Sequence, residues 1–321
     1  MNENKKYLFP FLFLIYFFLI YGFLNGEDAI KGAKLDFYSH EKAGLAFSTN
    51  FIETFLNYDE IRMRHSPLHY ILRSFFVNNE NIFRFVFLHT MLISVFFFYK
   101  SLCLKYKNKD NLIIYFAALL VLLPTFRSYS IWPDPHLLGF LFFMISIYFY
   151  LKFKNSENKN SKYLFAKYNT FFLVFSAYCS PNYGLFVIFY LFNFFRLIKD
   201  NNLFLRLLIY NFILSIPFFL YLFVYDINFI FGDAEFNIGD NIYSITNISN
   251  KIILILSLLL FYQIPLFFNG NIKNYLSSIF KYKKLFFIIF IIFIFLSLNF
   301  DFSKAYNITN SGGGLIYFVS S

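Results

Sequence analysis

The feature that most constrains this chain is a succession of nine apolar stretches, at residues 7–24, 82–104, 112–126, 136–152, 169–180, 183–198, 204–225, 249–268 and 284–299. A helix needs about 20 apolar residues to cross a bilayer core roughly 30 Å thick, and shorter helices are tolerated inside a bundle. Hydrophobic residues make up 59% of the sequence and charged residues only 14%, whereas soluble domains carry about 25% charged residues. The sequence therefore predicts an all-α, polytopic transmembrane helical bundle of about nine spans.

Three points of this organisation leave alternatives open. The segment 169–198 is either a re-entrant hairpin bent at Ser180-Pro181-Asn182 or one long kinked helix. The first stretch resembles a signal sequence, but it is 18 residues long and lacks a small-x-small cleavage site, which favours an uncleaved anchor. We expect residues 1–321 to form a single transmembrane domain, and a C-terminal truncation is the alternative because the chain stops just after an apolar run.

The positive charge of the chain is distributed unevenly between the predicted loops. With the N-terminus in the cytoplasm and nine spans, the segments 1–6, 100–110, 152–168, 196–206 and 269–284 are cytoplasmic. They hold 18 of the 28 Lys and Arg residues but only four of the 18 acidic residues. An excess of Lys and Arg marks the cytoplasmic side. The net charge of +10 is therefore a topology signal, and the expected partners are membrane lipids rather than nucleic acid.

The longest predicted external loop, residues 25–80, carries the first group of candidate site residues. Residues 37–56 have apolar side chains at helical spacing, which is typical of an amphipathic juxtamembrane helix lying in the membrane interface. A helix that begins near Leu35 places Asp36 and His40 one turn apart on one face, where a carboxylate and an imidazole could share a proton or a ligand. The alternative is an ordinary solvated helix face.

A cationic patch follows in the same loop. It contains Arg62, Arg64, His65 and His69, just before an apolar helix. Guanidinium groups bind phosphate oxygens in a bidentate fashion, so the patch predicts a site for a phosphate or pyrophosphate. Attraction to lipid headgroups is the alternative.

A short turn between the third and fourth stretches holds a second candidate acid, Asp134, between two prolines. Asp134 either caps the following helix or joins the first loop in one site. Trp132, the single Trp of the chain, stands at the depth expected of an interfacial anchor. A divalent metal ion stays an open alternative, because the acids of the loop 226–248 have the oxygen ligands that hard cations prefer. No other cofactor is expected, and Cys103 and Cys179 have no disulfide or metal-ligand spacing.

Four motifs, in this order along residues 35–200, resemble the GT-C superfamily of membrane glycosyltransferases. The similarity is to the branch that holds the protein O-mannosyltransferases, the aminoarabinose transferases of lipid A and the bacterial lipopolysaccharide-core transferases. Asp36-Phe-Tyr-Ser-His40 resembles the essential acid of the first external loop, and His65-Ser-Pro-Leu-His-Tyr70 the motif leading into the second span. Trp132-Pro-Asp-Pro-His-Leu-Leu-Gly139 resembles the second acid, and Val174-Phe-Ser-Ala-Tyr-Cys-Ser-Pro-Asn-Tyr-Gly184 a tight hairpin.

This resemblance implies inverting transfer of a sugar from a polyprenyl-phosphate donor to a glycan, lipid or protein acceptor. The site would face the non-cytoplasmic side of a bacterial inner membrane. Asp36 would be the base, and Asp134 would position the acceptor or a metal ion. The substrate-binding residues would be His40, Arg62, Arg64, His65 and His69. The rival function is a transporter or flippase of polyprenyl-linked glycans, but transporters usually carry ionisable groups near the bilayer midplane, and the predicted spans hold almost none.

Overall fold

The structure is a computed structural model that describes residues 8–61, 63, 65–107, 111–198, 200–224, 249–250, 252–253, 256–257 and 283–300. Within these ranges the regular elements are helices and there is no strand, so the predicted all-α class is confirmed. The chain separates into two compact units, Met1–Ala234 and Glu235–Ser321, and each is described by itself. The prediction of a single domain stays a prediction.

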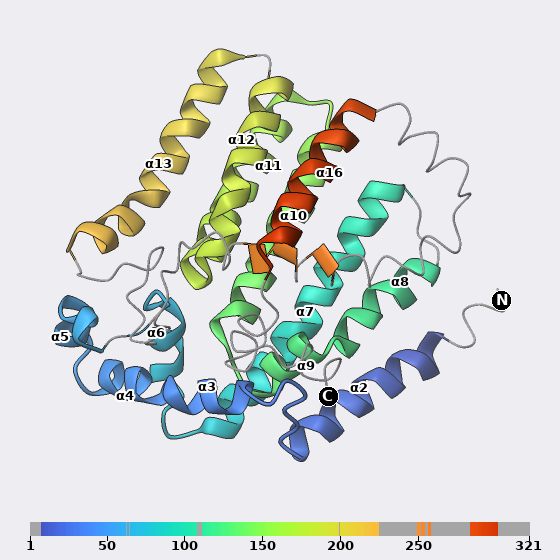
Figure 1. Ribbon diagram of the computed structural model, residues 1–321. Helices are drawn as coiled ribbons and strands as arrows, with labels where there is room; N and C mark the ends of the chain where they lie inside the picture. The colour runs from blue at the N-terminus through green and yellow to red at the C-terminus, as the bar shows by residue number, and fades with distance from the viewer. Residues whose placement is uncertain are drawn as a thin grey trace. The chain divides into compact units, whose positions relative to one another are not determined.

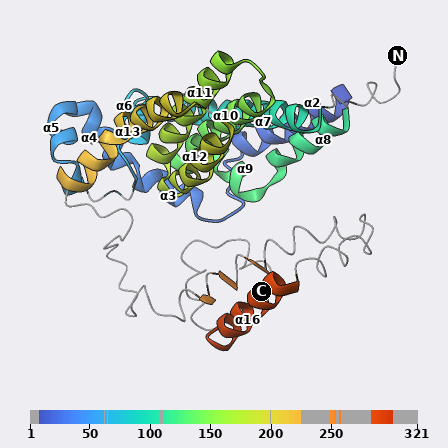
Figure 2. The same cartoon turned by 90° about the horizontal axis from the view of Figure 1, so that it is seen from above.

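The first unit contains a long-helix bundle and a group of short helices (Figure 1). The long helices are α2 (Leu8–Leu24), α7 (Glu80–Tyr106), α10 (Pro135–Asn155), α11 (Lys159–Cys179), α12 (Phe186–Leu197) and α13 (Asn201–Val224). The short ones are α3 (Ala33–Ser39), α4 (Glu41–Thr49), α5 (Phe51–Leu56), η1 (Tyr58–Ile61), α6 (Leu68–Ser74), α8 (Asn111–Ala118), η2 (Leu119–Leu122), α9 (Pro124–Ile131) and η3 (Pro181–Leu185). Seen from above, α10, α11 and α12 lie in the middle of this unit, with α2 and α8 to one side (Figure 2). The described part of the second unit contains α16 (Lys283–Leu298).

Three of the described helices are long and apolar enough to cross a membrane: α7, α10 and the part of α13 at Asn201–Phe219. A fourth span results if Ile113–Leu122 and Pro124–Ile131 count as one, although they meet at 66°. The bend falls at Leu123, whose backbone is extended because the residue before a proline is pushed out of the helical region. Several membrane-capable helices are thus confirmed. Nine spans stay a prediction, and most of the stretch 249–268 lies outside the described residues.

Helices α10 and α11 pack closely through small and polar residues. A Cβ on Gly139 would lie 3.2 Å from Cβ of Cys179, and the Gly139 carbonyl accepts a hydrogen bond of 2.7 Å from the Ser176 hydroxyl. Asn169 donates to both oxygens of Ser146 at 2.9 and 3.1 Å. Bonds between polar groups inside apolar helices avoid the cost of leaving them unpaired, so they fix the register of this helix pair.

The chain reverses direction between α11 and α12. Lys159, the first residue of α11, lies 2.5 Å from the carboxylate of Asp200, just beyond α12. Of the two alternatives for residues 169–198, the hairpin therefore describes the structure. Helix α11 begins well before residue 169, because Lys159, Lys162 and Lys167 interrupt the apolar run without interrupting the helix.

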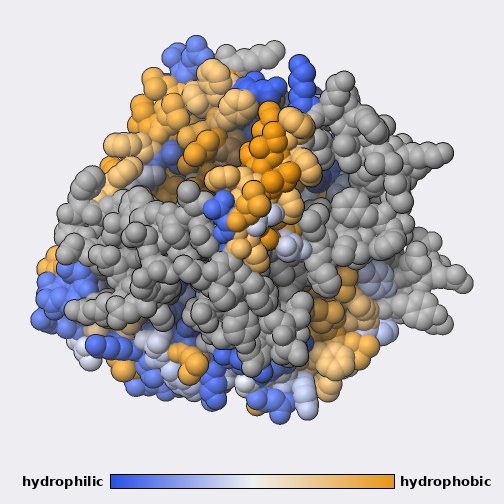
Figure 3. Space-filling view, in the orientation of Figure 1, coloured by the Kyte–Doolittle hydropathy of each residue, from blue (hydrophilic) through white to orange (hydrophobic). Residues whose placement is uncertain are grey.

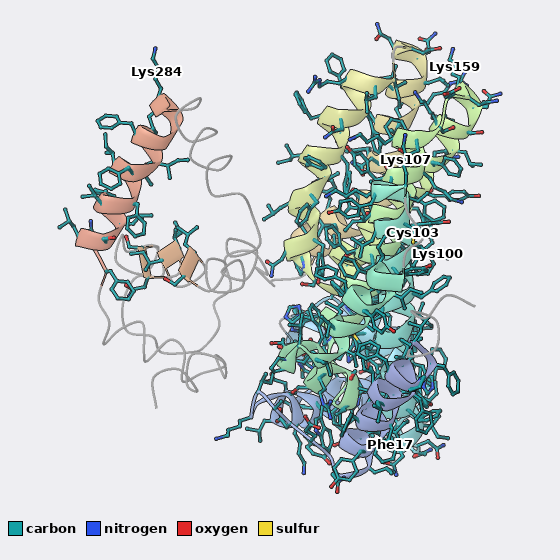
Figure 4. The ribbon with its side chains drawn as sticks, turned by 90° about the vertical axis from the view of Figure 1, so that its right-hand side faces the viewer. Phe17, Lys100, Cys103, Lys107, Lys159 and Lys284 are labelled. Carbon is teal, nitrogen blue, oxygen red and sulfur yellow. The ribbon has the colours of Figure 1, made fainter. Side chains whose placement is uncertain are left out.

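One end of the bundle gathers basic residues. Asn155 at the end of α10 donates to the Leu104 carbonyl near the end of α7, and Figure 4 shows Lys107 and Lys159 toward the end opposite Phe17. In the view of Figure 3, hydrophobic side chains cover α12 and α13, and hydrophilic ones dominate the lower edge at α4 and α5. The basic residues lie at or beside the ends of α7, α10, α11, α12 and α13: Lys100, Lys105, Lys107, Lys152, Lys154, Lys159, Lys162, Arg196 and Arg206.

The loop between α2 and α7 folds into short helices rather than one long amphipathic helix. The first break falls at His40 and the second at Asn50, whose side chain accepts from the backbone N–H of Glu53 and caps α5. Among the apolar residues at helical spacing, Phe37, Ala43 and Phe47 are buried inside the protein, whereas Phe51 and Phe55 are exposed. The location of this segment in the membrane interface stays a prediction. A small core of its own holds this segment together: Ala43, Phe47, Tyr58 and Tyr70.

Candidate active site

Helix α3 presents Asp36 at the surface of the short-helix segment. The carboxylate of Asp28 accepts hydrogen bonds from the backbone N–H groups of Ala33 and Lys34, at 3.3 and 3.1 Å, and so satisfies donors at the start of α3. Phe37 is buried and fixes the inner face of the helix, while the Asp36 side chain is exposed. Asp36 and His40 are one turn apart, as expected, and the backbone N–H of His40 donates to the Asp36 carbonyl at 3.0 Å. The His40 side chain is buried, whereas that of Asp36 is exposed.

The turn after α2 is tied to the turn before α10. The indole N–H of Trp132 donates to the carbonyls of Gly26 and Glu27, at 3.3 and 3.1 Å. Glu27 also pairs with Arg127 at 2.6 Å. Trp132 is buried, so the expectation of an interfacial anchor is wrong: its N–H binds carbonyl groups of the protein rather than the headgroup region. These contacts join the segment that follows α2 to the segment that carries Asp134.

Asp134 is buried, with 4% of its surface exposed, and it caps α10. Its Oδ1 accepts from the backbone N–H of His136 at 2.7 Å, as expected of an N-cap residue. Burial raises the pKa of the Asp134 carboxyl, and the negative charge of Asp36 raises it further, while positive charge on His136 and the backbone hydrogen bond oppose the increase. The cap predicted as one alternative is present, and the two predicted acids lie close enough to interact electrostatically.

Four of the five histidines gather beside these acids. The ring centroids of His40 and His65 are 5.7 Å apart, those of His40 and His69 6.1 Å, and those of His65 and His136 5.1 Å. The rings come from the junction of α3 and α4, the segment before α6, α6 itself and the start of α10. We call His40, His65, His69 and His136 the histidine cluster.

The inner part of the histidine cluster is electrically neutral at pH 7. Burial lowers the pKa of His40 to about 4, with help from the charges of Arg73 and His136. Burial also lowers the pKa of His69, which has no exposed surface, and neither of its ring nitrogens has a hydrogen-bond partner among the described residues. His69 therefore lies beneath the site surface, where it supports the ring of His40. His65 is more accessible, and its carbonyl accepts a 2.6 Å hydrogen bond from the buried Tyr58 hydroxyl.

The structure brings together Asp36, Asp134, His40, His65 and His69, whereas Arg62 and Arg64 lie outside the described residues. In the part of the chain that is described, no group of three or more His, Cys, Asp or Glu side chains is arranged to hold a metal ion.

Sequence reasoning missed His136 and its partner Ser180 as site residues. His136 follows Asp134 by two positions, which is a signal that could have found it, but its contact with Ser180 joins residues far apart in the chain.

The comparisons with known proteins add no relative: no family model, no curated protein and no solved structure matches this chain.

Proposed function

We propose that this protein is a membrane glycosyltransferase that moves a sugar from a polyprenyl-phosphate donor to a glycan, lipid or protein acceptor. The observation that carries the proposal is the packing of Phe37, next to Asp36, on Trp132, two residues before Asp134, with ring centroids 5.7 Å apart. The two acids come from distant parts of the sequence and lie beside a cluster of imidazoles. Pairs of carboxyl groups in different environments, one exposed and one buried, are typical of sites that move protons.

The reaction follows from these groups. The Asp36 carboxylate takes the proton of the acceptor hydroxyl while the acceptor oxygen attacks the anomeric carbon from the face opposite the phosphate. The bond between the anomeric carbon and the phosphate oxygen breaks, and its electron pair leaves with the phosphate, so the configuration inverts. Arg62, Arg64 and His65 stabilise the charge that develops on the phosphate, the task for which preorganised donors are suited.

The remaining site residues hold the substrates in place. Asp134 positions the acceptor, or a divalent metal ion if the reaction requires one, through the carboxylate oxygen that does not cap α10. The buried rings of His40 and His69 lie beneath the substrate-binding surface and define its shape. No other cofactor enters this reaction.

The site lies on the non-cytoplasmic face in this proposal. The basic residues at the far ends of α7, α10, α11 and α13 support a cytoplasmic location for that end of the bundle, since Lys and Arg mark the cytoplasmic side. The remainder of the arrangement is proposed with it: nine spans, an inner bacterial membrane, a cytoplasmic N-terminus and the loop 25–80 outside. A long isoprenoid donor then reaches the site laterally from the bilayer, near the headgroup plane.

Transfer by the purified protein tests this function against its rival. The protein in liposomes is given radiolabelled polyprenyl-phosphate sugars and candidate acceptors. A glycosyltransferase releases polyprenyl phosphate and labels the acceptor. A transporter or flippase moves the intact donor between leaflets without labelling any acceptor, and that result would replace the proposed function.

A further inference from the structure

His136 is held by a contact that the proposed reaction has not yet used. Its Nδ1 lies 2.9 Å from the hydroxyl oxygen of Ser180. Ser180 is the C-cap residue that follows α11, is 1% exposed, and precedes Pro181. Its own backbone N–H donates to the Ser176 carbonyl at 2.9 Å. The hydroxyl therefore stands on a rigid turn and fixes the orientation of the imidazole.

When the His136 ring carries a single proton, the same contact selects its tautomer. The Ser180 hydroxyl is buried, and His136 is its partner among the described residues. If Nδ1 carried the proton, the hydroxyl would accept and its own hydrogen would be left without an acceptor, which costs about 1–3 kcal/mol for a buried group. If the hydroxyl donates to Nδ1, both groups are satisfied and the ring proton sits on Nε2. The free nitrogen of His136 is then a hydrogen-bond donor.

Two features around this donor favour an anion, while the Asp134 carboxylate, which accepts from the backbone N–H of His136 at 2.7 Å, opposes it. His136 stands in the first turn of α10, a helix of 21 residues, whose N-terminus carries partial positive charge. Its ring meets that of His65 edge to face, with centroids 5.1 Å apart, so two imidazoles can donate to one phosphate group. By sequence, His65 directly follows the Arg62-Met63-Arg64 segment, which the proposed function assigns to the phosphate.

We propose that His136 donates a hydrogen bond from Nε2 to a phosphate oxygen of the lipid-linked donor, and that Ser180 is the positioning residue that holds the ring for this purpose. The inference deepens the proposed function and rests on it. Asp134 and His136 then have separate roles at the start of α10: the carboxylate caps the helix, and the imidazole contacts the phosphate of the lipid-linked sugar.

Two amide substitutions separate this role from a structural one. His136→Asn keeps a polar group near the Nδ1 position and can preserve the contact with Ser180, but it has nothing at Nε2. His136→Gln gives up the contact but places near Nε2 an amide N–H₂ group, which donates without any choice of tautomer. Binding of a polyprenyl phosphate to the purified full-length protein is followed through the fluorescence of Trp132, the single Trp of the chain. His89→Asn, on α7 outside the histidine cluster, is the matched control.

The expected result is that His136→Asn weakens binding about 10-fold or more, the loss expected for one hydrogen bond to a charged group, while His136→Gln and His89→Asn stay within about 3-fold of the wild type. Equal binding by wild type and His136→Asn, or weak binding by His136→Gln alone, would overturn the inference and leave the proposed function standing. If the wild type itself does not bind the polyprenyl phosphate, the proposed function fails first.

Ser180→Ala provides a second measurement that does not depend on the stability of the His136 variants. In ¹⁵N-histidine spectra of the wild type, the His136 ring shows the Nε2–H tautomer. Ser180→Ala produces a tautomer mixture and weaker polyprenyl-phosphate binding, and Ser180→Thr restores both. A wild-type ring with its proton on Nδ1, or unchanged spectra and binding in Ser180→Ala, overturns the role assigned to Ser180 and with it the donor at Nε2.

Discussion

Phe37 packs against Trp132 with ring centroids 5.7 Å apart, and this contact joins the helix that carries Asp36 to the turn that carries Asp134. The guanidinium of Arg73 lies over the rings of Phe37 and Phe83, 3.9 Å from the centroid of Phe37 and 5.8 Å from that of Phe83. The position of Asp36 relative to Asp134 thus depends on buried aromatic contacts rather than on the loop backbone alone.

Arg73→Lys tests this dependence. Lysine keeps the charge but loses the planar group that stacks on Phe37, and a desolvated cation–π contact contributes about 2 kcal/mol. We expect a loss of about 1–2 kcal/mol in the free energy of unfolding and lower transfer, because α3 is held less firmly. Arg206→Lys, exposed at the other end of the bundle, should change neither. Thermal unfolding in detergent and the transfer rate are measured for both variants. Equal stability and equal transfer in the two variants would rule out this role for Arg73.

Asp134→Asn separates capping from chemistry. Asparagine is as good an N-cap as aspartate, so α10 should keep its start. Burial and the charge of Asp36 raise the pKa of Asp134 above its ordinary value of 3.8. The ionised carboxylate therefore lowers the free energy of unfolding as the pH rises above 3.8. The variant should therefore be at least as stable as the wild type at pH 7, by thermal unfolding, while its transfer rate falls. Loss of stability with unchanged transfer per folded molecule would leave Asp134 as a cap and nothing more.

Acid should destabilise the protein through His40. Its pKa is lowered from 6.5 to about 4, so between these values the unfolded chain binds a proton that the folded chain does not. Stability is present in full above about pH 6.5 and falls as the pH drops towards 4, by on the order of 3 kcal/mol. His69 acts in the same direction. The unfolding midpoint is measured from pH 4 to 7. Its slope against pH should be smaller in His40→Gln than in the wild type and unchanged in His89→Gln. An identical slope in His40→Gln and the wild type would contradict the effect.

Labelling of introduced cysteines tests the proposed orientation. Asn57 and Asn160 are both exposed, one in the loop 25–80 and one at the end of the bundle that gathers the basic residues. In a background with Cys103 and Cys179 replaced by Ser, a Cys at position 57 should react with an impermeant maleimide in intact cells. A Cys at position 160 should react only after the membrane is permeabilised. The reverse pattern would place the site in the cytoplasm.

Local patterns in the sequence predict the features that depend on neighbouring residues. The apolar spacing of residues 37–56 predicts helix in that segment, and the position of Asp134 before Pro135 predicts the cap of α10 as one of two alternatives. The pattern misses the break at Asn50, because a capping bond to the backbone of Glu53 competes with continuation of the helix.

Contacts between distant segments could not be predicted in the same way. Trp132 has an amphipathic side chain suited to the membrane interface, yet it binds the carbonyls of Gly26 and Glu27. The pairing of His136 with Ser180 depends on where α11 ends against α10, and no local pattern in either segment encodes it. The order of the motifs predicts that Asp36 and Asp134 share a site, and the packing of Phe37 on Trp132 brings them near each other.

The measurement that tests the account most directly is the transfer rate of Asp36→Asn. Asparagine keeps the shape and removes the base, and loss of a proton acceptor typically costs 10²–10⁴-fold in rate. Asp28→Asn, which keeps one of the two oxygens that accept hydrogen bonds at the start of α3, and Glu27→Gln, which weakens the contact with Arg127, are the controls. With radiolabelled polyprenyl-phosphate sugar and equal amounts of membrane protein, Asp36→Asn should lose transfer by about 10²-fold or more, and both controls should be milder. Near wild-type transfer by Asp36→Asn would contradict the account.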